Sequence, residues 1–112
     1  MKFIVIICAY NCEKWIGKCI SSLISQTYKS YDCFIIDDVS TDNTSLKIKN
    51  LILGLDNFTF VQNKIKYYQT GNYDQIIRDS SINDQDVIVQ LDGDDWFPDE
   101  NVLNRLCKYY SE

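Results

Sequence analysis

Histidine is absent from this 112-residue sequence, and its five cysteines include no C-x-x-C pair. Proteins bind zinc mainly through histidine nitrogen and cysteine sulfur, so a zinc site has little support here. The cysteines are odd in number and stand at positions 8, 12, 19, 33 and 107. We therefore expect reduced, mostly buried thiols in a cytoplasmic protein.

Positive charge is also scarce, since 11 Lys and Arg face 16 Asp and Glu for a net charge of −5. A protein that follows the phosphates of nucleic acid needs a basic face, so we expect no nucleic-acid partner. No apolar run approaches the roughly eighteen residues of a transmembrane helix. The short apolar stretch 3–9 lacks a following cleavage pattern, which argues against a signal peptide.

The length and the 46% hydrophobic share suit a single globular domain over residues 1–112 with an ordinary core. Short apolar runs predict buried strands. They cover residues 3–8, 33–36, 58–61 and 87–91.

Helical patterns separate these runs. Apolar residues recur at helical spacing over 15–24, and a second helix is expected between an N-cap at Ser40 or Thr41 and a stop at Gly54. Segment 64–72 is expected to be mostly loop, with a third helix from Tyr73 that includes Ile76, Ile77 and Ile82.

A last helix is expected to begin near Pro98. Its inner face would carry Val102, Leu103, Leu106 and one of Tyr109 and Tyr110. Trp96 and Phe97 would pack this helix against the sheet rather than stack on a sugar. Strands alternating with helices predict an α/β fold, a Rossmann-like parallel sheet of about four strands flanked by helices.

Polar side chains follow three of the predicted strands, at the edge where ligands bind in such sheets. They are Tyr10 and Asn11, Asp37 and Asp38, and Asp92, Asp94 and Asp95. Helix capping and solvation alone could explain Asp37 and Asp38, and also Asp42 and Asp99.

The Asp92–Asp95 group is harder to explain by capping. Two carboxylates about 5 Å apart near a surface repel by roughly 3 kcal/mol at an effective dielectric constant of about 20. A divalent cation removes this cost, and carboxylate ligands without histidine favour Mg²⁺ or Mn²⁺. Two protein carboxylates are too few to hold Mg²⁺, so the ion would share its coordination with a diphosphate. Gly93 lets the backbone turn and lets a ligand approach.

Three stretches of the chain together resemble family-2 glycosyltransferases of the GT-A fold. They are IVIICAYN, CISSLISQTYKSYDCFIIDDVSTDNT and VIVQLDGDDWFPDENVL. The order and spacing resemble the nucleotide-sugar-binding half of that family over essentially the whole chain. The combination includes Tyr-Asn after the first strand, the Ser22–Tyr28 motif S-x-x-x-Q-T-Y, the Asp-Asp pair and the Asp-x-Asp-Asp motif.

The resemblance implies metal-dependent, hexosyltransferase-like transfer from a nucleotide-diphosphate sugar, with a UDP-sugar favoured and with inversion at the anomeric carbon. The loop Cys8–Asn11, including Ala9, Tyr10 and Asn11, would line the base and ribose. Asp38, beside Asp37, would contact the base, and Arg78 could meet a phosphate. Asp92 would approach the ribose or sugar, and Asp94 with Asp92 would bind Mn²⁺ or Mg²⁺.

The sequence departs from the family at Cys8-Ala9, where Pro-Thr is usual, and at Val39, where glycine is usual. The family's catalytic base is expected beyond the chain end, which leaves the acceptor and the base unidentified. The chain is therefore expected to be truncated after the Asp-x-Asp motif, with an exposed sheet edge that could form a homo-oligomer. The alternative is a non-catalytic nucleotide-sugar-binding module or remnant that needs a partner chain.

Overall fold

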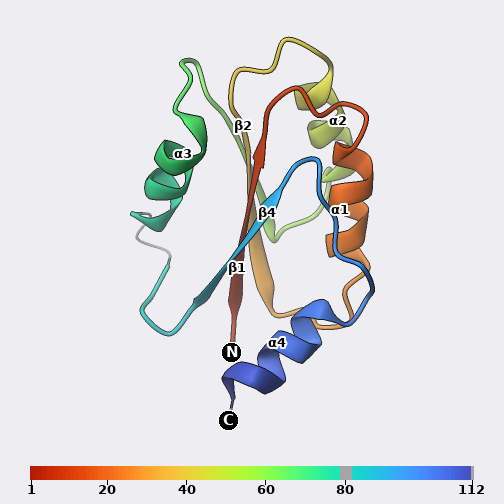
Figure 1. Cartoon of the computed structure of the whole chain (residues 1–112), viewed down its shortest axis with the longest axis vertical. Coiled ribbons are helices and arrows are strands. Elements are labelled where there is room, and N and C mark those ends of the chain that lie inside the picture. Colours follow the sequence, from red (N-terminus) through yellow and green to blue (C-terminus); the bar gives the residue numbers. More distant parts are fainter. Residues whose placement is uncertain (79–81, 112) are drawn as a thin grey trace.

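A parallel four-stranded sheet forms the centre of the protein in a computed structural model, which describes residues 1–78 and 82–111 (Figure 1). The strands are β1 (Phe3–Ala9), β2 (Tyr31–Asp37), β3 (Phe58–Gln62) and β4 (Val87–Asp92). They lie in the order β3-β2-β1-β4. The predicted α/β fold is confirmed, and each strand contains the apolar run that predicted it.

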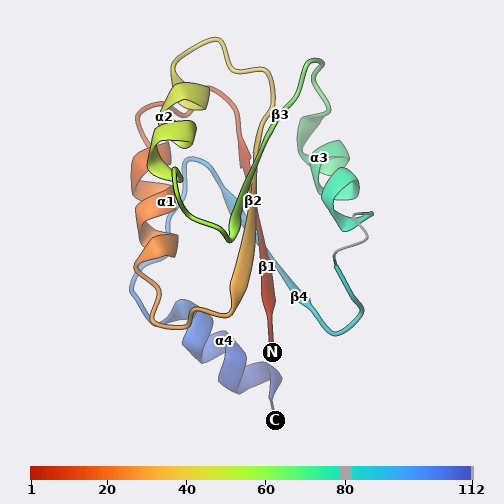
Figure 2. The same ribbon diagram turned by 180° about the vertical axis from the view of Figure 1, so that it is seen from behind.

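Helices cover both faces of this sheet. α1 (Ile16–Ile24) and α2 (Thr44–Leu51) lie on one face, whereas α3 (Tyr68–Ile77) lies on the other (Figures 1 and 2). α4 (Val102–Tyr110) lies beside the two chain ends, at the opposite end of the sheet from the carboxyl ends of the strands. Helices on both faces explain why the strand sequences are continuously apolar rather than alternating.

β1 is buried from both sides. Phe3, Val5 and Ile7 belong to the core under α1, whereas Ile4 and Ile6 belong to a second core under α3. All five side chains are at most 1% exposed. The register sets Ala9 beside Asp37 and Cys8 beside Asp92, so the carboxyl ends of β1, β2 and β4 meet at one edge. The chain passes from β3 through α3 to β4, which lies on the other side of β1 from β2 and β3. The strand order therefore reverses at β1, and the carboxyl edge there is a topological switch point, where ligands bind in such sheets.

Two helix starts differ from the predictions. α2 begins at Thr44, so neither Ser40 nor Thr41 is its N-cap, and Gly54 follows the helix at φ +80°. α3 begins at Tyr68, so the predicted loop over 64–72 is wrong in its second half. Ile77 is 52% exposed rather than part of the core.

The last helix begins later than predicted. α4 starts at Val102, and Pro98 lies in the turn that precedes it. Leu103 is fully buried, but Tyr109 and Tyr110 are 75% and 52% exposed, so the prediction that one of them faces inward is wrong.

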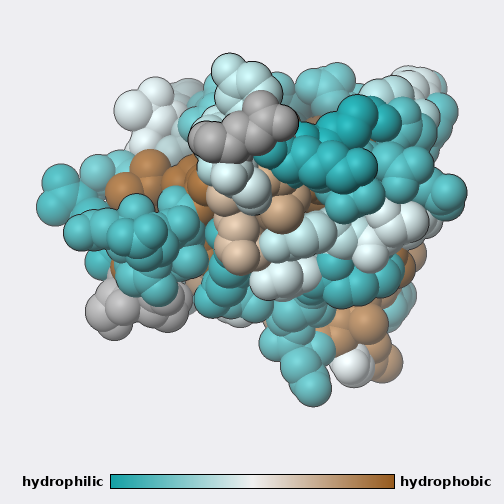
Figure 3. Space-filling view, turned by 90° about the horizontal axis from the view of Figure 1, so that it is seen from below, coloured by the Kyte–Doolittle hydropathy of each residue, from teal (hydrophilic) through white to brown (hydrophobic). Residues whose placement is uncertain are grey.

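The end of the molecule opposite the carboxyl ends of the strands is largely hydrophilic, with apolar groups in separate small patches (Figure 3). Within the described residues, no helix has the length and apolar character needed to cross a membrane. All five cysteines are free thiols, of which Cys12, Cys19 and Cys33 are buried. Burial raises the pKa of Cys12 to about 11 and that of Cys19 to about 12, so both remain protonated at neutral pH.

Candidate functional site

A cavity of about 240 Å³ opens at the carboxyl edge of the sheet, between the ends of β1 and β4. We call it the central cavity. It is bounded by the loops after β1 and β4, by Asp38 after β2 and by the start of α3. Its lining residues are Cys8, Ala9, Tyr10, Cys12, Asp38, Lys66, Tyr68, Gln69, Asn72, Asp92, Gly93 and Asp94.

Three carboxylates gather at one side of this cavity. Asp92 ends β4, and Asp94 and Asp95 follow it in a turn closed by the Asp95 N–H, which donates to the Asp92 carbonyl at 2.9 Å. Each carboxylate offers an oxygen within 4.8 Å of the others. Burial raises the pKa of Asp92, and the charges of Asp95 and Asp94 raise it further. The turn therefore holds the acidic side chains at the spacing of a cation site.

Gly93 permits this arrangement through close packing. A Cβ at Gly93 would lie 2.7 Å from Cys12 Sγ and 3.2 Å from both Ala9 Cα and Ala9 Cβ. Gly93 does not adopt a positive φ. Its role here is thus to let the β4 turn lie against the loop after β1.

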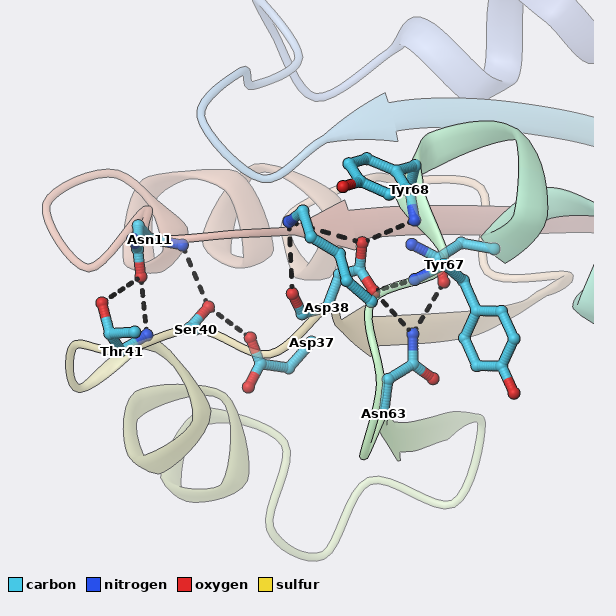
Figure 4. Close-up of polar contacts among 10 residues, drawn as sticks. Asn11, Asp37, Asp38, Ser40, Thr41, Asn63, Tyr67 and Tyr68 are labelled. Carbon is cyan, nitrogen blue, oxygen red and sulfur yellow. Dashed lines mark hydrogen bonds and ion pairs between the residues drawn. The ribbon is translucent and has the colours of Figure 1, made fainter.

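Asp38 is buried and acts as an anchor for the loop that leads into α3 (Figure 4). Its Oδ1 accepts hydrogen bonds from the Tyr67 N–H and from Asn63 Nδ2, both at 2.9 Å, and its Oδ2 accepts from the Tyr68 N–H at 2.9 Å. Burial alone would raise the pKa of Asp38, but these donors, together with Lys66, lower it overall. The carboxylate is ionised and already bonded to protein N–H groups.

Asp37 and Asn11 lie outside the central cavity and connect the loops after β1 and β2 (Figure 4). Asp37 Oδ1 accepts from the Ser40 hydroxyl, and its buried Oδ2 has no partner among the described residues. The Asn11 N–H donates to Ser40 Oγ at 2.9 Å, and Asn11 Oδ1 accepts from the Thr41 N–H at 2.8 Å. Asp37 and Asn11 therefore fix the wall of the site rather than line it.

Backbone strain gathers around the same edge. Among the described residues other than glycine, those with positive φ are Asn11 (47°), Val39 (65°) and Tyr68 (62°), all in or beside loops at the site. The left-handed region is rare for such residues, above all for a β-branched one. Such strain often gathers at functional sites. The family that the sequence resembles usually has glycine at position 39, the residue that most readily adopts such a positive φ.

Among the described residues, Lys66 is the one basic side chain that lines the central cavity. Its Nζ lies 3.3 Å from the centroid of the Tyr10 ring and 3.6 Å from Asp38 Oδ2. Tyr10 is half exposed, so the ring and the ammonium group together form one wall of the opening. A cation over an aromatic face is favourable, more so when it is partly desolvated.

Gln69 and Asn72 complete the wall formed by α3. Gln69 Nε2 donates to Asp92 Oδ1 at 2.9 Å, and the buried Asn72 accepts from Asn63 Nδ2 at 2.8 Å. Lys66, Gln69 and Asn72 were not predicted as site residues, because segment 64–72 was expected to be mostly loop. Gln69, Asn72 and Tyr73 stand at positions i, i+3 and i+4 of α3, which share one face of a helix. A helix predicted over this segment would therefore have placed the two amide side chains on the same face.

The structure does not bring Arg78 to this site. Its side chain is 78% exposed and pairs through Nε with Asp74 at 2.9 Å, directly after the end of α3 that lies away from the cavity. The residues that were predicted for the site and do line the central cavity include Ala9, Tyr10, Asp38, Asp92 and Asp94.

Trp96 does not pack the last helix against the sheet as expected. Its ring stacks on Trp15 with centroids 6.1 Å apart, and Lys18 Nζ lies 3.7 Å from its centroid. Phe97, in contrast, is half buried against the main core. Asp42 and Asp99 play the local roles foreseen for them, since each accepts a backbone N–H at the start of the following helix or turn.

Comparison with known proteins points in one direction. The family model described as "Glycosyl transferase family 2" matches residues 4–112. Glycosyltransferase GlyA of Streptococcus pneumoniae is 29% identical over 99% of this chain and 16% of its own length. The putative glycosyltransferase EpsE of Bacillus subtilis is 32% identical over 84% of this chain and 33% of its own.

Solved structures share the fold. Mannosyltransferase PcManGT from Pyrobaculum calidifontis, in complex with GDP-Man and Mn²⁺, superposes with a TM-score of 0.86 at 18% identity, over 99% of this chain and 32% of its own. The present chain thus spans about a sixth to a third of the length of the relatives that it matches.

Proposed function

The chain belongs to glycosyl transferase family 2, and from this membership we propose that the central cavity binds the diphosphate of a nucleotide-sugar donor with a divalent cation. The observation that carries the proposal is the carboxylate group at the cavity. Asp92, Asp94 and Asp95 offer oxygens within 4.8 Å of one another, and Asp92 and Asp94 line the cavity. Like charges at this spacing repel one another, and a cation between them would remove that repulsion.

These residues fit Mn²⁺ or Mg²⁺. Both ions take carboxylate oxygens, and no histidine is present to favour zinc. Asp94 and Asp92 would hold the ion, with Asp95 beside them, and positions would remain for oxygens of a diphosphate. When bound, such an ion stabilises negative charge on the departing diphosphate. The Mn²⁺ in the PcManGT complex supports this assignment by fold likeness.

The nucleoside would lie against the wall formed by Ala9, Tyr10 and Lys66. Tyr10 presents an exposed ring, and Lys66 supplies a positive charge within the cavity. Asp38 is assigned to an N–H of the base, which would have to join or replace the bonds from Tyr67 and Tyr68. Asp37 and Asn11 would hold this wall in place from outside the cavity.

Transfer of a hexosyl group with inversion is the reaction that we infer from the family. A UDP-sugar is the favoured donor, and S. aureus TarS, solved in complex with UDP-GlcNAc, has the same fold with a TM-score of 0.79 at 22% identity over 99% of this chain and 31% of its own. No side chain of residues 1–78 and 82–111 is assigned as the base that activates an acceptor. The alternative is a non-catalytic nucleotide-sugar-binding module or remnant that needs a partner chain. Release of free sugar from the donor would favour the enzyme, and donor binding without transfer or hydrolysis would favour the module.

A second copy of the chain is a further proposed partner. β4 lies at the edge of the sheet, and Val87, Ile88 and Val89 are only half buried. Antiparallel pairing of two β4 strands would cover this edge. Light scattering should give a dimer mass, and a monomer at high concentration would contradict the proposal.

The binding proposal is tested by NMR titration of the isotope-labelled 13.1 kDa chain. UDP and GDP are added with Mg²⁺, which is diamagnetic. Amide shifts are expected near Tyr10, Lys66, Gln69 and Asp94. Shifts only in the separate hollow formed by Asn11, Glu13, Lys14, Trp15, Asp42 and Lys47, or no shifts, would contradict the proposal.

A further inference from the structure

One stripe of side chains on α1 and its flanks contacts the segment that carries the acidic residues. Trp15, Cys19 and Ser22 are spaced by four and three residues, so they lie on one side of α1, and Gln26 follows two residues after the end of the helix. Each of them contacts segment 92–103. Ser22 and Gln26 are also the serine and glutamine of the S-x-x-x-Q-T-Y motif noted in the sequence, in which Thr27 follows Gln26.

Gln26 provides the firmest of these contacts. Its side chain is fully buried, and Nε2 donates to the Asp99 carbonyl at 2.7 Å and to the Ser22 carbonyl at 3.0 Å. Its Oε1 accepts from the Leu103 N–H at 3.0 Å. Both N–H donors and the oxygen of the amide are thus used, and two of the three bonds hold the segment after the acidic turn.

Ser22 and Thr27 bond to the same segment, at Phe97 and at Glu100. Ser22 Oγ donates to the Cys19 carbonyl at 2.7 Å and accepts from the Phe97 N–H at 3.0 Å. The Thr27 N–H donates to the Glu100 carbonyl at 2.9 Å. We call Ser22, Gln26 and Thr27 the α1 clamp.

Two contacts fix the segment nearer the carboxylates. Cys19 Sγ lies 3.5 Å from the Asp92 carbonyl oxygen as a donor, and Trp96 stacks on Trp15. Asp94 and Asp95 therefore lie in a short turn whose two ends are both attached to α1. The three carboxylates repel one another, so a free turn would spread them apart.

We propose that the α1 clamp is a set of positioning residues that holds Asp94 and Asp95 at the spacing a divalent cation requires. The cation role rests on the proposed function, whereas the restraint of the turn does not. Pre-organised ligands bind a metal more tightly because fewer conformations are lost on binding. None of the three clamp residues lines the central cavity, so their loss should weaken metal binding through the spacing of the carboxylates and not through a lost ligand.

The test uses Gln26→Leu, which keeps the size of the side chain and removes its three hydrogen bonds. Ser22→Ala is the second variant, in case the first does not fold, and removes one bond to the segment, from the Phe97 N–H, and one bond within α1, to the Cys19 carbonyl. Ser21→Ala is the matched control, because Ser21 is exposed one position away on the same helix. Hydrogen exchange of the Asp95 amide reports on the turn, since Asp95 N–H bonds to the Asp92 carbonyl and not to the clamp.

We expect Asp95 amide exchange to accelerate at least about 10-fold in Gln26→Leu, while amides of β1 keep their rates. The Mn²⁺ dissociation constant, measured by electron paramagnetic resonance of free Mn²⁺, should rise at least about 5-fold. Ser21→Ala should change neither. An unchanged Asp95 exchange rate in the folded variants would overturn the clamp. Failure of the wild type to bind Mn²⁺ would instead refute the proposed function, and the exchange result would still decide the restraint.

Discussion

Replacing Asp38 with asparagine should strongly destabilise the protein, because this carboxylate joins β2 to the start of α3. Three N–H groups donate to it at 2.9 Å, from Tyr67, Tyr68 and Asn63. Hydrogen bonds to a charged acceptor contribute about 1.5–3 kcal/mol each. Asparagine keeps one acceptor oxygen and directs an NH₂ group toward one donor. We expect the free energy of unfolding to fall by about 2–4 kcal/mol at pH 7.

The assay is urea denaturation followed by circular dichroism and tryptophan fluorescence. Asp74→Asn is the matched control, since Asp74 is 58% exposed and pairs with Arg78 on the surface of α3. Its loss should change the free energy of unfolding by less than about 0.5 kcal/mol. An effect of Asp38→Asn as small as that of the control would refute the role assigned to this carboxylate.

The same comparison carries a pH signature. Burial tends to raise the pKa of Asp38, but the bonded N–H groups lower it below the usual 3.8. A carboxylate whose pKa is lower in the folded state stabilises the protein fully above its ordinary pKa, and this stabilisation is lost as the pH falls through the folded-state value. The gap between wild type and Asp38→Asn should therefore close in acid. A gap that stays constant from pH 7 down to pH 2 would contradict this reasoning.

Three further substitutions test the site. Val39→Gly should raise the free energy of unfolding by about 0.5–1.5 kcal/mol, because valine is strained at φ 65°; a loss of stability in urea titration would refute the strain. Gly93→Ala should lower it by about 1–3 kcal/mol, since the added Cβ meets Cys12 Sγ at 2.7 Å; wild-type stability would contradict the packing. Asp92→Asn should stabilise the metal-free protein at pH 7, because burial and the neighbouring carboxylates raise the pKa of Asp92. That gain should vanish below about pH 4, where both proteins are uncharged at this position, and a gain that persisted there would have another cause.

Much of the fold could be predicted from local pattern, because buried parallel strands have a distinct composition. The run Phe3–Cys8 is apolar at every position, and β1 is indeed covered on both faces. The acidic group after β4 could also be foreseen, since a strand end fixes where its following residues lie. The residues that follow β1, β2 and β4 then lie at the same edge of the sheet, because the strands are parallel.

The start of α3 could not be predicted in this way. Its first N–H groups, from Tyr67 and Tyr68, bond to Asp38, which is about thirty residues away in sequence. A local sequence pattern does not reveal a helix cap supplied by a residue so far away in sequence. Because the start of α3 was not predicted, Lys66 and Gln69 were not predicted as site residues. Likewise, Trp96 contacts Trp15 from the other end of the chain, so its true partner was not visible in the sequence.

The central claim is that Asp94 holds a divalent cation that joins the nucleotide to the protein. Calorimetric titration of UDP and GDP, with and without Mn²⁺, on wild type, Asp94→Asn and the control Asp99→Asn tests it most directly. Asp99 is a carboxylate on the same segment that pairs with Arg105 outside the cavity. We predict nucleotide binding that requires Mn²⁺, persists in Asp99→Asn and is lost in Asp94→Asn. Equal binding by all three proteins, or none by the folded wild type, would contradict the account.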